Sequence, residues 1–373
     1  MQAMRLIVVL AFCLPIALHA QDAVVLQDIE KVYTVRVESV RAVDNKDIAN
    51  TGVTQKTQTI KVIFTDGEKV GQSIILNDDP YESKVGESLF VRYIKTADGR
   101  EYYSIMEPNR LPVLLGLTIL FVLVVLVFGG KHGFFALVAL VLSFGSIFVI
   151  LFPQLLKGGD PIITSLFIAS ISLFFVMFFS HGWNRVTLSA YLGCAFAILV
   201  TVFLAKYAVV LAKLSGFSDE SSVYLNLATS GTLNFQSLLI AAIIIGVIGV
   251  VDDVAITQAQ VVAQLYESNP KASTLEIYRR AMKVGKDHSA ALINTLVLAY
   301  AGASLPLLLL LYTSSAPLLQ LLNMEAIAVE IVRTIVGSIG LVILVPCATV
   351  ISFALIRKEH AVHTAHTSHG HKH

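Results

Sequence analysis

The feature that most constrains this chain is a series of apolar segments that fills its sequence from Leu111 onward. A helix needs about 20 apolar residues to cross a hydrocarbon core about 30 Å thick. Segments of that length lie at about 111–129, 133–153, 161–180, 187–209, 236–262, 289–312 and 329–356. The 373-residue chain is 55% hydrophobic and 14% charged, which is too apolar for a soluble domain. The sequence predicts a multi-pass α-helical membrane protein, with about seven transmembrane helices within residues 109–357 and a lipid bilayer around them.

Residues 1–20 have the pattern of a secretory signal peptide. Arg5 supplies a positive start, Leu6–Leu14 an apolar core, and Ala20 a small residue at the cleavage point. Leu18 is larger than the residue usually found at the −3 position, so an uncleaved anchor stays an alternative to cleavage. Either leader predicts that the following segment lies outside the cytoplasm.

A small β-domain is predicted at residues 21–108. In KVYTVRVESV, residues 31–40, apolar and polar side chains alternate, as on a half-buried strand. Four later segments repeat this period and are separated by turn signals. Five short strands predict an extracytoplasmic all-β domain, either OB-like or another small barrel. Tyr102 and Tyr103 fit either a binding face for an envelope partner or ordinary strand packing.

The basic residues agree with seven spans that start outside. Cytoplasmic connections of membrane proteins carry an excess of Lys and Arg. The predicted inner connections and C-terminus hold Lys131, Arg185, Lys271, Arg279, Arg280, Lys283, Lys286, Arg357 and Lys358. The outer connections between spans hold little more than Lys157 and Lys213. The sequence therefore predicts a cytoplasmic (inner) membrane protein with the β-domain outside and a disordered tail, residues 358–373, in the cytoplasm.

Several function classes are disfavoured. The formal net charge of +1, without a basic aromatic patch, predicts no nucleic-acid partner. Cys13, Cys194 and Cys347 form neither a disulfide framework nor a cysteine-based metal site. The sequence contains no nucleotide-binding loop, Ser-x-x-Lys pair or His-Glu-x-x-His run. We therefore expect neither ATP-driven chemistry nor an enzyme, and no cofactor beyond a bound proton or cation.

Two adjacent carboxylates, Asp252 and Asp253, interrupt the apolar segment 236–262 in GVIGVVDDVAITQ. A charged Asp at the centre of a span costs about 2.5–3.5 kcal/mol on insertion scales. Asp253 shares one helical face with Ala242, Gly246, Gly249, Thr257 and Gln260. This face is predicted to point into the helix bundle, with Asp252 about 100° away. Two like charges in a low dielectric favour a proton on one of them unless a cation binds, so the pair predicts a proton or cation site.

The sixth predicted span carries further polar side chains. Asp287 and Asn294 are seven residues apart and share a face, with Thr295 beside them. Pro306 follows a small-residue segment, where the helix is predicted to bend or break. The preceding connection contains the capping-box pattern Ser273 to Glu276, which predicts a separate short helix ending near Val284.

The seventh predicted span begins with Glu330 and Arg333, which are close enough along a helix to pair. Arg333 also has the length to reach a carboxylate on another helix. Such intramembrane polar groups have a simpler interpretation as hydrogen bonds between helices. For Thr257, Asn294 and Thr295 this alternative has equal weight.

The C-terminal segment HAVHTAHTSHGHKH is rich in histidine. Imidazoles bind transition metals, and the repeated His-x-x-His spacing permits chelation. The six residues are His360, His363, His366, His369, His371 and His373. In a short tail, adventitious metal capture explains them as well as a physiological metal role does.

Long parts of the sequence resemble a known family. IGVIGVVDDVAITQAQVVAQL, IYRRAMKVGKDHSAALINTLVLAYAGASLPLLLL and EIVRTIVGSIGLV are similar to the YibE/F-like membrane proteins over roughly residues 110–356. The resemblance implies a bacterial multi-pass membrane protein, and the preceding β-domain also fits it. It places Asp253, Asp287, Asn294, Thr295, Glu330 and Arg333 at signature positions. Asp252 fits only a subset of relatives, the His-rich tail lies outside the pattern, and the family supplies no substrate.

The sequence favours a transporter or permease. Asp253, helped by Asp252, would bind a proton or cation, while Asn294, Thr295 and the Glu330–Arg333 pair would line or gate the route. One alternative is a non-transport scaffold that presents the β-domain to envelope partners. Another is an intramembrane aspartyl protease that uses Asp253 and Asp287 as a proton-sharing pair, although neither lies in a protease motif. The sequence leaves the oligomeric state open.

Overall fold

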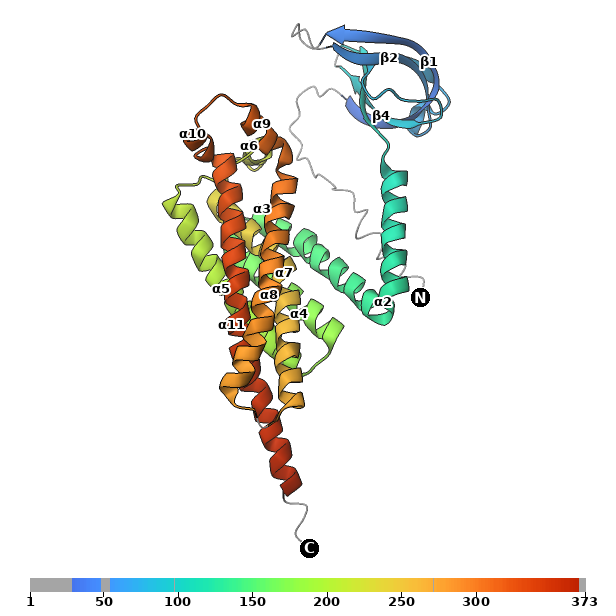
Figure 1. The fold of residues 1–373 in the computed structure, drawn as a ribbon. Coiled ribbons are helices and arrows are strands. Elements are labelled where there is room, and N and C mark those ends of the chain that lie inside the picture. Colours follow the sequence, from blue (N-terminus) through green and yellow to red (C-terminus); the bar gives the residue numbers. More distant parts are fainter. Residues whose placement is uncertain (1–28, 48–53, 97, 271, 369–373) are drawn as a thin grey trace. The chain divides into compact units, whose positions relative to one another are not determined.

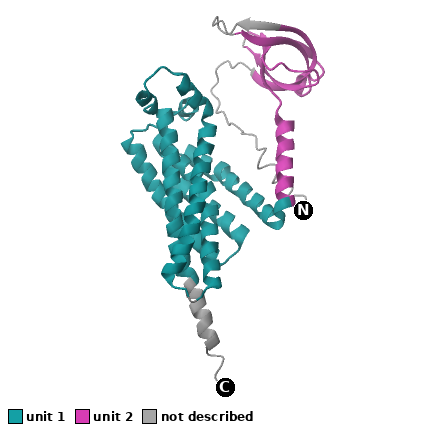
Figure 2. Cartoon of the chain, in the orientation of Figure 1, with its two compact units in different colours: residues 1–14, 128–373 teal, residues 15–127 magenta. Residues whose placement is uncertain are grey.

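The computed structural model describes two compact units, which are considered separately (Figures 1 and 2). One contains the N-terminal sheet and ends at Val127, and the other begins at Phe128. The described residues are 29–47, 54–96, 98–270 and 272–368, with only the backbone beyond Ile356. The predicted signal peptide lies outside this range.

The N-terminal unit is a five-stranded antiparallel sheet curled into a half-barrel. Its strands are β1 (Ile29–Asp47), β2 (Thr54–Phe64), β3 (Ser73–Asp79), β4 (Ser88–Lys95) and β5 (Glu101–Pro108), in the order β3-β2-β1-β4-β5. The long β1 pairs with both β2 and β4. Register shifts after Val37 and Val40 bend β1, as β-bulges do. The five predicted strands are confirmed.

The core of the sheet follows the predicted alternation along β1. Tyr33, Val35 and Val37 are buried, whereas Arg36 and Glu38 are exposed. Val35 lies opposite Phe64 of β2 and Leu89 of β4, and both are also buried. Apolar residues from β1, β2 and β4 therefore meet on one face of the sheet.

A charged cluster joins the short helix η1 (Gly67–Lys69) to β5. The Lys69 ammonium donates to Glu101 at 2.9 Å and to the Tyr103 hydroxyl at 2.6 Å. It also lies 4.4 Å from the centre of the Tyr93 ring, a distance at which a cation and a ring attract. Tyr103 therefore takes part in packing, while Tyr102 is 50% exposed.

The remainder of the described chain is helical. Its elements are α2 (Leu111–Ser146), η2 (Ile147–Leu151), α3 (Phe152–Leu156), α4 (Pro161–His181), α5 (Arg185–Leu211), α6 (Glu220–Ala228), α7 (Phe235–Ser268), α8 (Thr274–Ala303), α9 (Leu305–Thr313), α10 (Leu318–Leu322) and α11 (Glu325–Ser368). Capping side chains fix several starts, because they accept bonds from otherwise unpaired N–H groups. Asp160, Asn184, Asn234 and Ser273 cap α4, α5, α7 and α8 in this way.

Five described helices are long and apolar enough to cross a membrane, and six if the bent pair α8–α9 counts as one span. Seven spans were predicted, and the difference in the count arises at the first helix. The predicted spans 111–129 and 133–153 are two parts of one helical stretch, Leu111–Leu156, of 46 residues. Gly130 interrupts it with φ 52° and ψ −129°, a conformation that glycine adopts readily because it lacks a β-carbon.

The α8–α9 pair corrects one prediction and confirms two. Ser273 caps α8 by accepting from the Glu276 amide, as the capping-box pattern predicted. The prediction that a short helix ends near Val284 is wrong, since α8 continues without a break to Ala303. The pattern marks a helix start, but no residue after Val284 stops the helix. The predicted break before Pro306 is confirmed, because α8 and α9 meet at 68°.

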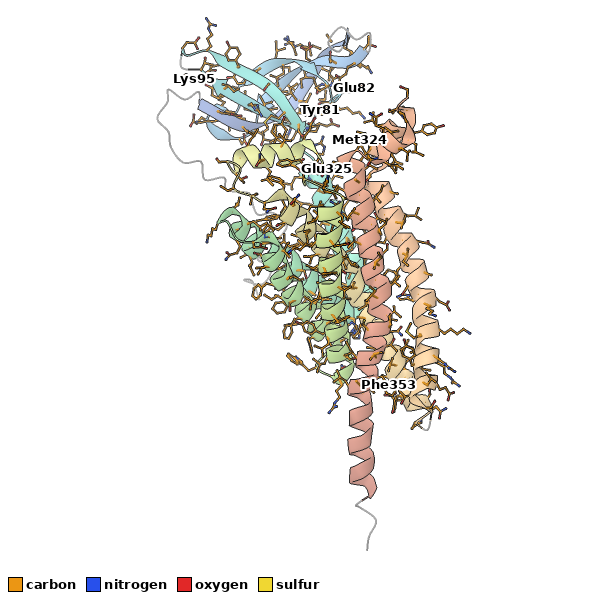
Figure 3. All side chains as sticks on the ribbon, turned by 90° about the vertical axis from the view of Figure 1, so that its left-hand side faces the viewer. Tyr81, Glu82, Lys95, Met324, Glu325 and Phe353 are labelled. Carbon is orange, nitrogen blue, oxygen red and sulfur yellow. The ribbon has the colours of Figure 1, made fainter. Side chains whose placement is uncertain are left out.

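The long helix α11 packs against α5, α7 and α8, as its position among them in Figure 1 shows. Small residues permit this approach, as at other helix contacts in membranes. Gly193 of α5 lies against Ala348, and Gly340 lies against Thr201. Glu325, labelled in Figure 3, lies at the start of α11. Its carboxylate accepts bonds from the Ser215 hydroxyl and from the Ser215 and Gly216 amides. This bond set fastens α11 to the turn after α5.

Candidate ion site

A cavity of 480 Å³ lies between α2, α4 and α7 in the helical unit. Four titratable side chains line it: His132, His181, Asp252 and Asp253. The rest of its wall consists of small, apolar or hydroxyl side chains. The two carboxylates singled out from the sequence therefore share a largely apolar cavity with two imidazoles.

Helix α7 brings both carboxylates to the cavity. The Asp252 carboxylate accepts a bond from the Asp253 amide at 2.9 Å. The Asp253 carboxylate makes no hydrogen bond to any side chain or backbone group that the structure describes. The Asp253 side chain is also exposed.

The prediction that the Asp253 face points into the packed bundle is wrong. Along this face Gly246, Gly249, Asp253 and Gln260 are exposed, and Thr257 is half-buried. The buried face instead carries Val247, Val251, Val254, Ala255, Gln258, Ala259 and Val262. This face is the more apolar one, and it packs against the other helices. Of the residues on the Asp253 face, only Asp253 lines the cavity.

His181 reaches the cavity from the last position of α4. The chain reverses immediately after it, because Gly182 has φ 76° and ends the helix. Asn184 donates to the His181 carbonyl at 2.9 Å and caps α5 by accepting from the Thr187 amide. The turn between α4 and α5 thus fixes the position of this imidazole.

His132 comes from α2, two residues after the break at Gly130. The charge of His132 and that of Asp253 both act on His181, so the imidazole of α4 lies within electrostatic range of both. Sequence reasoning missed these two histidines. One sequence signal could have found them. Each histidine lies close to a basic residue, Lys131 or Arg185, and both of those residues were predicted to lie on the same side of the membrane.

The donor set limits what the cavity can hold. Within the described ranges, no group of three or more His, Cys, Asp or Glu residues is arranged to hold a metal ion. Two carboxylates and two imidazoles can exchange protons, and the cavity has room for water. The histidine side chains of the tail lie outside the described residues, so the metal prediction there stays a prediction. The backbone of α11 continues to Ser368, past the predicted tail boundary at 358.

Asp287, Asn294 and Thr295 lie elsewhere. All three are exposed on α8 and none lines the cavity. The Thr295 hydroxyl donates to the Ala291 carbonyl of its own helix at 3.1 Å, so in this arrangement it does not join two helices. Asp287 does not line the cavity that holds Asp253, so this cavity gives no support to the predicted carboxylate pair of a protease.

The predicted Glu330–Arg333 pair is confirmed. The two side chains form an ion pair of 2.9 Å on α11, and each is about a quarter exposed. Both charges act on Tyr300 of α8, whose hydroxyl lies against Gly246 of α7. A second polar cluster thus joins α7, α8 and α11 away from the cavity.

Gln258 is a buried polar residue that sequence reasoning passed over in favour of Gln260. Its amide donates to the Ala281 carbonyl of α8 at 3.0 Å and to the Thr349 hydroxyl of α11 at 2.7 Å. It therefore links three helices and has a structural role. Nothing in the local sequence distinguishes it from Gln260 except its position on the apolar face.

Comparison with known proteins gives one match. The family described as YibE/F-like protein matches residues 117–358, the helical part of the chain. No curated protein and no solved structure matches the chain.

Proposed function

The chain belongs to the YibE/F-like protein family, and from this membership and the cavity at Asp253 we propose that it is a transporter or permease. Its family and its apolar helices identify it as an integral membrane protein. The proposed activity is movement of a solute or ion coupled to a proton or cation bound by Asp253, with Asp252 beside it. We propose no enzymatic step.

The observation that carries this proposal is a carboxylate without a hydrogen-bond partner among the described groups, on the wall of a cavity with room for water. Ionisable residues in membrane helices are costly and mark ion pathways more often than they serve packing. Gln258 illustrates the packing role, since its amide is fully engaged with neighbouring helices. Asp253 has no such partner among the described groups and lines the cavity instead. This contrast favours an ion site over a helix-bonding role.

We further propose the membrane arrangement. The stretch Leu111–Leu156 is about 69 Å long as a straight helix, enough for two crossings that reverse near Gly130. With the pair α8–α9 as one bent crossing, the chain then has seven. In this arrangement a cleaved signal peptide leaves the half-barrel outside a bacterial inner membrane and the C-terminus in the cytoplasm. The cavity then lies toward the cytoplasmic side, where both histidines are.

The second polar cluster supplies a role for the other signature residues. Arg333, Glu330 and Tyr300 lie where α7, α8 and α11 meet. We propose that this cluster gates the route at the end opposite the cavity. Asn294 and Thr295, exposed on α8, would line the route in a conformation in which α8 moves toward α7.

The test is a thermal-shift screen of the purified protein without its His-rich tail. Wild type, Asp253→Asn and the matched control Asp287→Asn would be compared against pH, monovalent and divalent cations, and small solutes. We expect one ion or a pH step to stabilise wild type and Asp287→Asn but not Asp253→Asn. A ligand present at a hundredfold excess over its Kd raises the free energy of unfolding by about 2.7 kcal/mol. A profile identical in all three proteins would contradict the ion site.

The scaffold remains the second candidate, because the half-barrel has its own core within its own unit. A scaffold would tolerate Asp253→Asn in every functional assay and lose its phenotype when residues 21–106 are deleted. A transporter would lose its function in Asp253→Asn and keep it when residues 21–106 are deleted. Growth of strains that carry each variant, with membrane levels matched by immunoblot, separates the two.

A further inference from the structure

Resting on the proposed ion site, we infer that the ion is a proton and that His181 passes it between His132 and Asp253. The inference starts from the titratable groups that share the cavity. His132, His181 and Asp253 all line that cavity, one from each of α2, α4 and α7. The charges of His132 and Asp253 both act on His181, so we place His181 between the other two groups in the relay.

Few titratable groups line the cavity beside His181. Helix α2 contributes His132, and α7 contributes Asp252 and Asp253. Helix α4 adds only Ser180, Val176 and Met177 to the wall, and the remaining lining is uncharged. Of the two carboxylates, Asp253 is the exposed one, and it is the one whose charge acts on His181. We therefore take Asp253 as the partner that receives the proton from His181.

The donor set suits a proton better than a metal cation. Calcium takes six to eight oxygen ligands, and structural zinc takes four ligands in a tetrahedron. The cavity offers two carboxylates and two imidazoles, and no three such groups converge within the described residues. Imidazole is the side chain whose charge changes near neutral pH. Two of them beside a free carboxylate are the components of a proton relay.

The transfer balances without any other reactant. The His181 imidazolium gives its N–H proton to a carboxylate oxygen of Asp253, directly or through one water, and becomes neutral. It then takes a proton from the His132 imidazolium or from water in the cavity. His132 recovers its proton from the aqueous side. The reverse sequence discharges Asp253.

Infrared spectroscopy of the full chain in lipid tests the inference without knowledge of the solute. A protonated carboxyl gives a C=O band that the carboxylate lacks. After a pH jump we expect such a band in wild type and its loss in Asp253→Asn. In His181→Gln the band should appear about tenfold more slowly or worse, because positioned acid–base groups contribute about 10²–10⁴-fold. Added imidazole should restore the rate, and the control His288→Gln, outside the cavity, should match wild type.

The outcomes separate this inference from the proposed function. If Na⁺, K⁺, Mg²⁺ or Ca²⁺ at constant pH removes the Asp253 band, the ion is a metal cation and the inference fails while the ion site stands. If Asp253→Asn leaves every carboxyl band unchanged, both fail. A wild-type rate in His181→Gln overturns the relay. Should His181→Gln not fold, His132→Gln provides the same rate test on the preceding member of the relay.

Discussion

Gly246 of α7 lies directly against the hydroxyl of Tyr300 on α8. A β-carbon at residue 246 would be 2.8 Å from that oxygen, closer than two such atoms normally approach. The tyrosine is in turn within range of the Glu330–Arg333 pair. One glycine thus sets how near the polar cluster comes to the helix that carries Asp253.

Gly246→Ala should destabilise the α7–α8 contact by about 1–3 kcal/mol, the usual cost of overpacking. Gly249→Ala is the matched control, because a β-carbon there meets nothing within 4 Å. Its effect should be neutral or favourable, since alanine is the better helix former. Adding Tyr300→Phe should recover most of the loss in Gly246→Ala. Unfolding in mixed detergent compares wild type, Gly246→Ala, Gly249→Ala, Tyr300→Phe and the double variant. Additive effects of Gly246→Ala and Tyr300→Phe would contradict the contact.

Gln258→Leu should lower bundle stability by about 0.6–1.7 kcal/mol, the measured range for hydrogen bonds between membrane helices. The variant loses the bonds to the Ala281 carbonyl and the Thr349 hydroxyl. Gln260→Leu changes the same side chain on the exposed face and should have little effect. The comparison uses the same detergent unfolding, and equal losses in both variants would argue against Gln258 as the link.

The half-barrel should weaken in acid through Glu101. Hydrogen bonds from Lys69, then from Tyr93 and Tyr103, lower the pKa of this carboxyl from 4.5 to about 2. Because the folded pKa is the lower one, the stabilisation is present above about pH 4.5 and is lost as the pH falls toward 2. Hydrogen exchange in β5 reports it.

Glu101→Gln should remove most of that pH dependence, whereas Glu107→Gln on the same strand should keep it. Glu107 is exposed and pairs at the surface with Arg110, where ion pairs contribute little. An acid profile unchanged by Glu101→Gln would show that other carboxyls carry the effect.

Asp79→Asn should destabilise the half-barrel by about 1–3 kcal/mol, the cost of leaving a buried hydrogen-bonding group unsatisfied. Burial opposes ionisation of Asp79, but bonds from Gln58 and from the Ser83 and Tyr81 amides outweigh it, so its pKa is lowered. In Asp79→Asn the side-chain amide group, itself a donor, would replace one of the two acceptor oxygens and leave at least one of these N–H donors without a partner. Glu82→Gln, an exposed carboxylate in the same connection, should be nearly neutral. Thermal unfolding followed by tyrosine circular dichroism distinguishes the two.

The strands and most helices were predictable because their signals are local. Alternation along β1 reports burial directly, since one face of that strand covers the core. The capping residue Ser273 likewise predicts where α8 begins. The end of the predicted short helix near Val284 was wrong, because amphipathic periodicity does not show whether the next apolar segment continues the same helix.

The site was only half predictable. The two adjacent carboxylates of α7 stand out in an apolar segment, so the sequence alone identified them. Periodicity grouped Asp253 with Gly246 and Gly249 but could not show which face of α7 its neighbours cover. His132 and His181 come from the ends of two other helices, more than 70 residues before Asp252 along the chain, and only the fold brings them to it.

The position of α11 has a consequence for biosynthesis. It is the last described helix to leave the ribosome, yet α5, α7 and α8 all pack against it. Until it enters the membrane, Gln258 lacks its partner on Thr349, and the turn at Ser215 lacks the Glu325 carboxylate. The earlier helices must therefore wait in the bilayer, or beside the insertion machinery, in an unfinished arrangement. A premature stop codon before Glu325 would leave them there permanently, as a substrate for membrane proteases rather than a smaller working protein.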